Sequence, residues 1–397
     1  MTKLEELINE LCPNGVEYRV LNTICDVYDG THQTPQYTDS GVKFASVENI
    51  SDPYATEKYI SVSDYEKYKI KPQRNDLLMT RIGSIGVCTV IESDEPLAYY
   101  VSLALLRPNN DVLNSRYLKY AIESLHCRKE LRKRTLVNAV PIKINMGDIG
   151  KITLPVPPLQ VQSEIVRILD NFAELSAELS AELSARKKQY EHYTYQLLNF
   201  SDVVTTKKLR DLVDFRNGKG HEKDIANDGK YIVVNSKFIS TNGEVKKYSN
   251  KQICPLYIDD ILMVMSDLPN GRALAKCYLV TENDKYTLNQ RIGAFHVKDE
   301  SVIKTKFLLY VLNRNQQLLR YDNGVDQTNL RKDDILDIMI PLLSIEEQER
   351  IVAILDRFNI LCNDISEGLP AEIEGRRKQY EYYRDKLLAF KPYLNAN

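Results

Sequence analysis

The chain has 397 residues and a mass of 45.7 kDa, a length typical of two or three domains. Its 43% hydrophobic and 27% charged residues exclude a disordered protein, and its apolar runs are too short to span a bilayer. The net charge of −2 argues against a simple nucleic-acid binder with one strongly basic face.

The opening sequence, MTKLEELINELCP, is amphipathic and carries three glutamates, a pattern typical of neither a secretory signal nor a transit peptide. We predict an N-terminal helical segment over residues 1–16, with the helix itself over 3–11. Seven scattered cysteines form no C-x-x-C pair, which argues against a disulfide framework or a cysteine-type zinc site and favours a reducing cytoplasm.

Two long blocks of the chain are neutral to mildly basic. Residues 17–155 contain 18 basic and 17 acidic side chains, and residues 201–340 contain 22 and 19. They alternate with acidic segments, an arrangement that random variation explains as well as anion binding does.

Residues 156–200 predict a long helix after a proline stop. Three prolines between residues 155 and 158 prevent the preceding strand from continuing, so we expect the helix to start near Leu159. Apolar and aromatic residues then recur at steps of three and four from Ile165 to Leu197, which is the spacing of a coiled-coil seam.

Within this helix the tetrapeptide Glu-Leu-Ser-Ala occurs three times without change, over residues 174–185. A purely structural role as part of a helix explains the local composition, because Glu, Leu and Ala favour helices. Three perfect copies also favour a modular ruler, because each unit adds about 6 Å of helix and about 40° of rotation.

An internal repeat organises the whole chain. Residues 148–172 align without gaps on 334–358 with eleven of 25 positions identical, and 186–200 align on 376–390 with nine of 15 identical. Weaker similarities between the two blocks, such as Asp-Leu-Leu-Met matching Asp-Ile-Leu-Met, extend the repeat. The chain is therefore predicted to be a duplication whose two blocks have diverged to do different things.

The second matched helix, within residues 341–397, contains Gly368, Pro370 and Gly375, which we expect to kink or interrupt it. The block 201–340 is too small to carry the chain back along a helix of about 60 Å, so the helices are predicted to pair antiparallel. The predicted fold is mixed α/β (α+β): two globular domains joined by two long antiparallel coiled-coil helices, with an approximate two-fold axis.

This layout resembles the specificity subunit of type I restriction–modification enzymes. The resemblance rests on the motifs L-P-x-P-P-L-x-x-Q-x-x-I-V-x-x-L-D and R-K-K-Q-Y-E-x-Y, although the second copy departs from the proline pattern. It implies five parts: an N-terminal helix (1–16), target-recognition domain 1 (17–155), a central helix with the ELSA repeats (156–200), target-recognition domain 2 (201–340) and a C-terminal helix (341–397).

The resemblance implies a non-catalytic subunit. Each recognition domain would read one half of a bipartite site in double-stranded DNA, and the helices would set the gap between the halves. Two adenine-N6 methyltransferase subunits would dock on this frame, and restriction and translocase subunits would join them. S-adenosylmethionine, ATP and Mg²⁺ are then expected on the partner subunits, with no cofactor bound by this chain.

A protein that reads bases uses Arg or Lys to bind guanine and Asn or Gln to bind adenine, and we expect these residues on projecting loops. An ordinary solvated loop residue is the competing interpretation at each position. By chemistry and loop position, the DNA-binding candidates are His32, Gln33, Lys43, Asn49, Arg81, Ser84, Asn217, Lys219, Asn235, Lys237, Arg272, Gln290, Arg291 and Gln327.

Six residues of the matched helices are candidates for partner docking, because tyrosine joins a large apolar ring to a polar end and the basic residues suit an acidic partner. Packing inside the coiled coil is the alternative for the tyrosines. The candidates are Arg186, Tyr190, Tyr193, Arg376, Tyr380 and Tyr383.

Motifs for chemistry of its own are missing from the sequence. Ser51-Asp52-Pro53-Tyr54 lacks the first proline of an adenine methyltransferase loop, and there is no GxxxxGK[ST] phosphate loop or histidine pair at zinc spacing. No catalytic or metal-binding residue is predicted. The alternative function is a structural coiled-coil adaptor that binds proteins through its two globular blocks.

Overall fold

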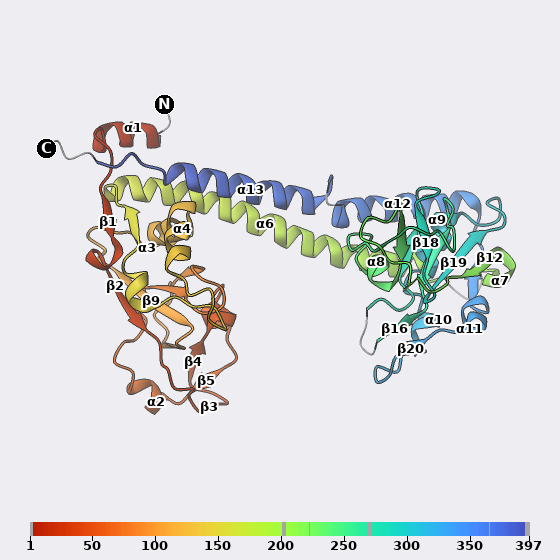
Figure 1. The fold of residues 1–397 in the computed structure, drawn as a ribbon, viewed down its shortest axis with the longest axis horizontal. Coiled ribbons are helices and arrows are strands. Elements are labelled where there is room, and N and C mark those ends of the chain that lie inside the picture. The colour runs from red at the N-terminus through yellow and green to blue at the C-terminus, as the bar shows by residue number, and fades with distance from the viewer. Residues whose placement is uncertain (1–2, 201–203, 222, 269–271, 365, 394–397) are drawn as a thin grey trace. The chain divides into compact units, whose positions relative to one another are not determined.

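The computed structural model describes residues 3–200, 204–221, 223–268, 272–364 and 366–393. The chain divides into two compact units. Unit 1 consists of Met1–Ala181 and Ala371–Asn397, and unit 2 consists of Glu182–Pro370. Each unit combines a globular domain of sheets and short helices with one part of the long helices (Figure 1).

Unit 1 begins with α1 (Lys3–Leu11), which coincides with the predicted N-terminal helix. Its strands are β1 (Tyr18–Val20), β2 (Cys25–Asp29), β3 (Tyr37–Thr38), β4 (Val42–Ala45), β5 (Tyr59–Ile60), β6 (Leu77–Thr80), β7 (Cys88–Val90), β8 (Leu97–Tyr99), β9 (Leu103–Pro108) and β10 (Thr153–Pro155). Its short helices are η1 (Leu21–Thr23), η2 (Val47–Asn49), η3 (Pro53–Ala55), α2 (Val62–Glu66), α3 (Ser115–Glu123), α4 (Leu125–Arg134) and α5 (Met146–Ile149).

The core of unit 1 has two layers around the sheet β2-β9-β6-β7. Side chains alternate across a strand, so Leu77 and Met79 of β6 face helices α3 and α6, whereas Leu78 faces the second sheet, β3-β5-β4-β8. Both faces of β6 are covered, and this explains why its sequence is apolar without interruption.

Unit 2 repeats this plan. Its strands are β11 (Thr206–Lys208), β12 (Val213–Asn217), β13 (Tyr231–Val234), β14 (Tyr248–Ser249), β15 (Ile261–Val264), β16 (Ser266–Asp267), β17 (Cys277–Leu279), β18 (Tyr286–Leu288), β19 (Ile292–Val297), β20 (Thr328–Asn329) and β21 (Met339–Pro341). Its short helices are α7 (Leu209–Leu212), α8 (Ser236–Ser240), α9 (Thr305–Leu312), α10 (Gln316–Leu319) and α11 (Lys332–Leu336).

The two domains share their sheet topology. The order β12-β19-β15-β17 in unit 2 corresponds to β2-β9-β6-β7 in unit 1, and the antiparallel pair β11-β21 corresponds to β1-β10. The single parallel contact within the second sheet is also repeated, as β4-β8 and β13-β18. The predicted fold class and the internal duplication are confirmed.

Three helices make up the frame: α6 (Leu159–Leu198), α12 (Ile345–Asn363) and α13 (Leu369–Leu387). In unit 1 the end of α13 packs into the same core as the start of α6, and Phe172 stacks on Tyr383 with ring centroids 5.5 Å apart. In unit 2 Tyr190 of α6 stacks on Phe358 of α12 at 6.0 Å. Within each unit the paired helices therefore run antiparallel.

The predicted interruption of the second helix lies between α12 and α13, beside Gly368 and Pro370. Pro370 occupies the first turn of α13, where a missing backbone N–H costs nothing. Gly375 does not break the helix, contrary to expectation, because it lies within α13 with no close neighbour. The predicted seam residue Ile365 lies outside the described residues.

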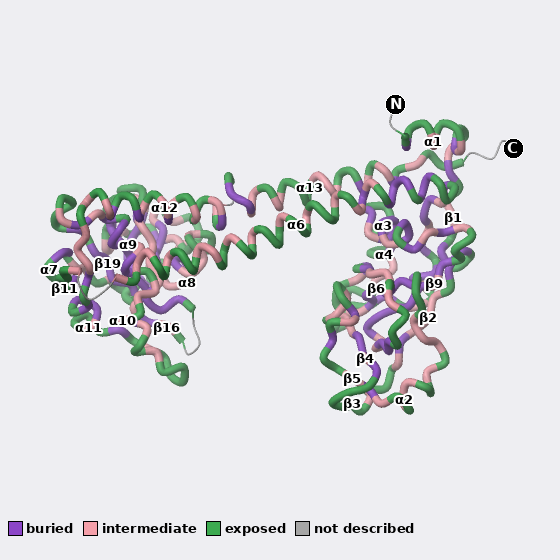
Figure 2. The backbone as a smooth tube through the Cα atoms, turned by 180° about the vertical axis from the view of Figure 1, so that it is seen from behind, coloured by how far each residue is buried: buried purple, intermediate pink, exposed green. Residues whose placement is uncertain are grey.

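Burial along α6 is uneven (Figure 2). Its buried residues all lie between Val161 and Leu169, beneath the domain of unit 1, whereas the predicted seam residue Leu175 is 48% exposed. The ELSA segment is thus a polar, exposed stretch of helix. Among the described residues no helix combines the length and apolar character needed to cross a membrane.

Candidate nucleic-acid interface

The glycine-rich turn after β6, residues 81–86, begins with a buried arginine. Arg81 donates from Nη1 to the carbonyl oxygen of Ile144 at 3.1 Å and from Nη2 to Asp29 at 3.2 Å. It is 7% exposed, so it does not project from a loop as predicted, because these two partners hold it inside the domain. Ser84, farther along the same turn, is exposed.

His32 and Gln33 are exposed beside this turn. His32 shares the Asp29 carboxylate with Arg81, its Nε2 lying 2.9 Å from Oδ2. Thr31, in the same segment, forms a β-bridge with Tyr100 in the turn between β8 and β9. A side chain at Gly30 would meet the Tyr100 carbonyl oxygen at 2.5 Å. Glycine is therefore required for the two turns to approach each other.

Lys43 lies in strand β4 of the second sheet of unit 1, and Asn49 lies in η2, the short helix that follows this strand. The Lys43 amine donates to the carbonyl oxygen of Tyr54 at 2.5 Å, so its position in β4 does not offer a free cation. Asn49 ends η2 and is half-buried. Neither residue belongs to a projecting loop, because Lys43 is part of β4 and Asn49 is the last residue of η2.

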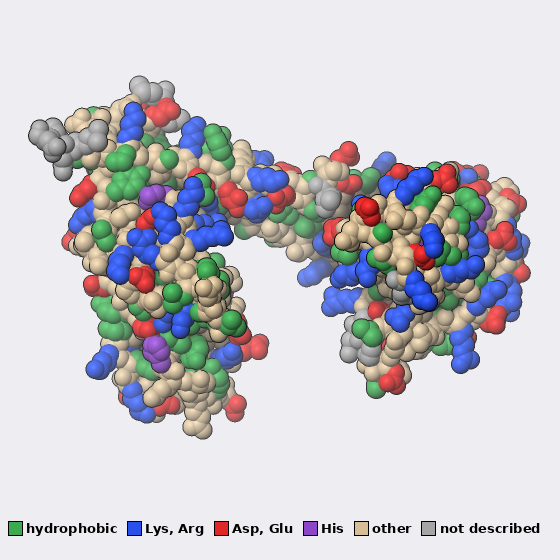
Figure 3. Space-filling view, viewed as in Figure 1, with side chains coloured by type: hydrophobic (Ala, Val, Ile, Leu, Met, Phe, Trp, Pro, Cys, Tyr) green, Lys and Arg blue, Asp and Glu red, His purple; other side chains and the backbone are tan. Residues whose placement is uncertain are grey.

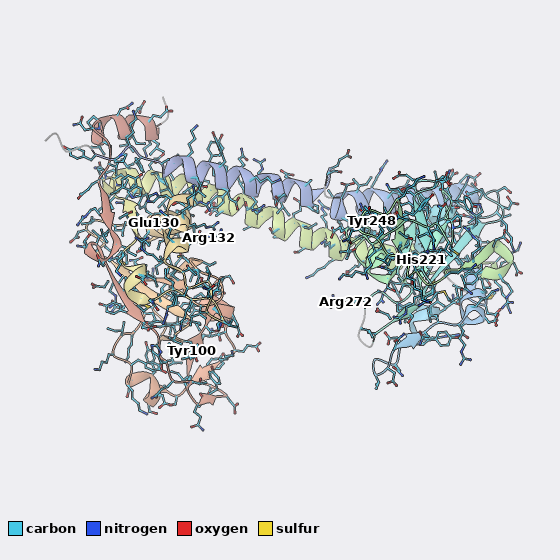
Figure 4. The ribbon with its side chains drawn as sticks, in the orientation of Figure 1. Tyr100, Glu130, Arg132, His221, Tyr248 and Arg272 are labelled. Atoms are coloured by element: carbon cyan, nitrogen blue, oxygen red, sulfur yellow. The ribbon has the colours of Figure 1, made fainter. Side chains whose placement is uncertain are left out.

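The sequence-based prediction missed a basic helix. In α4 five of the seven residues from Arg128 to Arg134 are Lys or Arg. Figure 3 shows Lys and Arg side chains gathered over this part of unit 1, and Figure 4 labels Arg132. The near-neutral charge of the whole block concealed this cluster, whereas the spacing of Arg128 and Arg132, one helical turn apart, is a signal that could have found it.

Two of the α4 cations are neutralised locally. Lys133 and then Arg134 lower the pKa of Glu130 by hydrogen bonds to its carboxylate. Within the described residues, Arg128, Lys129 and Arg132 have no ion-pair partner. These three are therefore available to an external anion.

Arg128 and Arg132 also border a cavity of 560 Å³. Its other walls are the turn that carries Ser84 and the exposed segment that contains Val137 and Ile142. Cationic side chains beside an exposed, partly apolar hollow can contact a phosphate backbone while neighbouring groups approach base edges. We name residues 83–87, 128–132 and 137–142 the α4 surface.

In unit 2, four of the predicted residues lie around Asn289, in the turn between β18 and β19. The Lys219 amide bonds to Leu288, and a side chain at Gly218 would meet the Asn289 carbonyl oxygen at 1.9 Å. The Asn289 amide in turn bonds to Val234, beside Asn235. Lys219 and Asn217 on one side, and Gln290 and Arg291 on the other, thus border one turn.

Gln327 directly precedes β20, and Arg272 lies in the loop that follows β16, the strand paired with β20. The Gln327 amide donates to Ser266 Oγ at 2.7 Å, which ties its loop to β16. Arg272 is exposed in the loop after β16 (Figure 4). Arg291 contacts the residue before β16, because its backbone carbonyl oxygen accepts a hydrogen bond from the Met265 amide.

Asn235 is the N-cap of helix α8, so its side-chain oxygen is already hydrogen-bonded within the domain. Its Oδ1 accepts from the Phe238 amide at 2.9 Å, as is usual for an asparagine before a helix. Lys237, two residues later, is exposed. The helix of unit 2 that corresponds to α4 is α10, which has only four residues, Gln-Gln-Leu-Leu, none of them a cation.

The predicted docking tyrosines divide into two kinds. Tyr380 and Tyr190 are half-buried, and burial raises the pKa of Tyr380 to about 12. Tyr383 and Tyr193 are 36% and 38% exposed while each stacks on a phenylalanine of the opposing helix. Arg186 bonds within its own helix, as Arg376 does, and both keep partly exposed side chains.

Each exposed tyrosine belongs to a small aromatic face. The two faces occupy equivalent places in the repeat, with ring centroids of adjacent partners 5.3–5.9 Å apart. The aromatic face of unit 1 consists of Phe172, Tyr382 and Tyr383, and that of unit 2 consists of Phe358, His192 and Tyr193.

A search of the described residues finds no group of three or more His, Cys, Asp or Glu side chains placed to hold a metal ion. All seven cysteines lie in the described part of the chain and are free thiols.

Known proteins resemble this chain over most of its length. The type I restriction modification DNA specificity domain matches twice, at residues 13–186 and 201–375. The specificity subunit of the Escherichia coli enzymes EcoR124I/EcoR124II is 35% identical over 271 residues, which is 62% of this chain and 65% of that protein. The MpnII specificity subunit of Mycoplasma pneumoniae is 29% identical over 317 residues, 63% of this chain and 92% of that protein.

Two solved structures share the fold. The S subunit of a type I restriction–modification system from M. genitalium has a TM-score of 0.53 at 13% identity, covering 94% of this chain and 96% of that one. A chain from a study of assembly and conformational transition in the type I R-M system has a TM-score of 0.62, also at 13% identity, covering 95% and 98%. With both halves of the repeat matched in sequence, this chain belongs to the type I restriction–modification DNA specificity family.

Proposed function

We propose that this chain is the DNA-reading subunit of a type I restriction–modification complex, in which each domain reads one half of a bipartite site. The observation that carries the proposal is the different chemistry at equivalent places of two domains with one topology. Tyr100 in unit 1 stands where unit 2 has Asn289, and His32 beside it is replaced by Gly220. Equivalent loops with different hydrogen-bonding groups suit two different half-sites.

Methylation, restriction and translocation of the DNA would be carried out by partner subunits. We propose that methyltransferase subunits bring S-adenosylmethionine and that restriction and translocase subunits bring ATP and Mg²⁺, while this chain binds no cofactor and performs no catalysis. The complex would act in the cytoplasm, where free thiols stay reduced.

Methylome sequencing tests this function directly. Cells that express this chain with its candidate methyltransferase partner are expected to gain N6-methyladenine in both strands of one new bipartite motif, relative to cells with the partner alone. If an active partner binds this chain and no new motif is methylated, DNA reading is excluded and the protein-binding adaptor becomes the better function.

The repeat suggests the partner stoichiometry. Two aromatic faces of the same construction, one on each unit, suit two copies of one partner better than two different partners. Tyrosines that are partly exposed and rigidly stacked provide apolar contact area with a polar end, as interface anchors do. We infer that one methyltransferase subunit docks on each face.

Replacing Tyr193 and Tyr383 by alanine is expected to weaken co-purification of the methyltransferase, at about 2 kcal/mol of binding free energy per face. Melting temperature should change little, because both rings are more than a third exposed. For the half-buried Tyr190 and Tyr380 we expect the melting temperature to fall instead, because their replacement by alanine should cost about 3 kcal/mol of the free energy of unfolding.

Tyr37→Ala is the matched control, because Tyr37 is 45% exposed on β3, away from the helices. Co-purification that survives the double replacement of Tyr193 and Tyr383, or that falls equally with Tyr37→Ala, would contradict docking on the aromatic faces.

A further inference from the structure

Each domain is fastened to its long helix by the same two groups of hydrogen bonds. In unit 1 the Gln162 side chain, 0% exposed, accepts from the Asn114 amide at 2.8 Å. Its amide nitrogen donates to the carbonyl oxygens of Val112 at 2.8 Å and Pro157 at 2.7 Å. One helical side chain thus binds the start of α3 and the entry to α6.

Gln348 does the same in unit 2. It is also 0% exposed, accepts from the Lys304 amide at 2.8 Å, and donates to Val302 at 3.1 Å and Leu343 at 3.0 Å. One partner is a valine in both units and the other two differ in residue type, but all of them are backbone groups at corresponding places. A buried glutamine that satisfies three backbone groups cannot be replaced by an apolar residue without leaving them unpaired.

A second contact lies two turns along each helix. The Tyr120 hydroxyl donates to Asp170 at 2.5 Å and Arg116 pairs with the same carboxylate at 2.6 Å. In unit 2 Tyr310 donates to Asp356 at 2.6 Å, and Lys306 takes the place of the arginine at 2.7 Å. Burial, reinforced by the bond to the carboxylate, raises the pKa of both tyrosines, so both hydroxyls remain donors at neutral pH.

We infer that Gln162 with Asp170, and Gln348 with Asp356, are positioning residues that fix the angle of each domain on its helix and so set the gap between the two half-sites. The inference rests on the proposed function. Two fastening points about 12 Å apart along a helix prevent a domain from swivelling about either one.

The required angular accuracy is high. A domain of this size has loops about 30 Å from its attachment, where a tilt of only about 7° moves a contact by one base-pair step of roughly 3.4 Å. A loosened domain should still recognise its own half-site, because the recognition loops are built elsewhere. It should accept that half-site at more than one distance from the other.

The experiment uses the assembled complex with its methyltransferase partner and DNA in which both half-sites are constant and the gap varies by one base pair either way. The variants are Gln162→Ala, and Tyr120→Phe together with Tyr310→Phe, which remove single hydroxyls without opening cavities. We expect the ratio of methylation at the cognate gap to methylation at the altered gaps to fall about tenfold, because about 1.4 kcal/mol of discrimination is lost.

Gln160→Ala is the control, since Gln160 is an exposed glutamine on the same helix. Selectivity for the half-site bases should stay as in the parent complex. Variants that lose melting temperature while their gap selectivity remains unchanged would overturn the inference, because the residues would then be structural only. If the parent complex methylates no bipartite site at all, the proposed function fails first, and that result is distinguishable from loss of gap selectivity.

Discussion

Replacing Arg128 and Arg132 together by alanine is expected to weaken DNA binding by the assembled complex about a hundredfold at physiological salt. Both are exposed cations on α4, border the same cavity and have no ion-pair partner among the described residues. Each charge-assisted contact to a phosphate contributes about 1.5 kcal/mol, so two contacts account for a loss of this size.

Salt dependence identifies the kind of contact. Each lost phosphate contact lowers the slope of log K against log salt by about 0.9, so the double variant should bind with a slope reduced by about 1.8. The methylated sequence should remain the same, because contacts to phosphates position a protein without reading bases. Binding measured over a series of salt concentrations, on cognate and unrelated duplexes, checks both statements.

Lys133→Ala with Lys151→Ala is the matched control. It removes the same charge from the same domain, but neither lysine borders the cavity, and Lys133 is paired with Glu130 and Lys151 with Asp148. Equal losses in the two double variants would show that general positive charge, and not the α4 surface, is responsible. An unchanged slope in the arginine variant would exclude phosphate contact there.

Deletion of one ELSA unit, Glu178–Ala181, is expected to abolish methylation of the cognate site and create methylation of a site with the same half-sites and a different gap. The segment is regular α-helix with exposed glutamates, so four residues can be removed without opening a core. The deletion shortens the helix by about 6 Å and turns it by about 40°, which corresponds to a change of one or two base pairs.

The second copy of the repeated helix consists of two separate helices, α12 ending at Asn363 and α13 beginning at Leu369. Methylome sequencing of the deletion variant reports the new gap. Replacement of the three ELSA serines by alanine alters composition and keeps length, and should leave the gap unchanged. Methylation at the original gap after the deletion would contradict the hypothesis that the ELSA units set the distance between the half-sites.

Residues that match between the two copies of the repeat make equivalent contacts in the structure. The identities Gln162/Gln348 and Asp170/Asp356 were visible as a repeat, and the structure shows them as equivalent domain-to-helix contacts. Gly30 and Gly218 occupy equivalent places in the two domains, and both lie against a neighbouring turn where a side chain would collide. Repetition marks positions that a fold needs twice.

Inference from sequence failed where side-chain orientation depends on distant residues. Arg81 stands in a glycine-rich turn, a pattern typical of exposed loops, but its partners are 52 and 63 residues away in sequence. The Lys43 amine donates to the Tyr54 carbonyl of its own domain, a contact that the local sequence does not indicate. The cations of α4 were overlooked because a net charge averages over a whole block.

The sequence by itself determined the duplication, the helical frame and the family, because identity between two aligned copies and periodicity along a helix are properties of the chain alone. Only the tertiary structure decided which polar residues share a surface. Lys219 and Asn289 meet through strand pairing across 70 residues, and Arg128 joins the turn of Ser84 through packing. Such contacts depend on how strands and helices pack together, which local patterns do not encode.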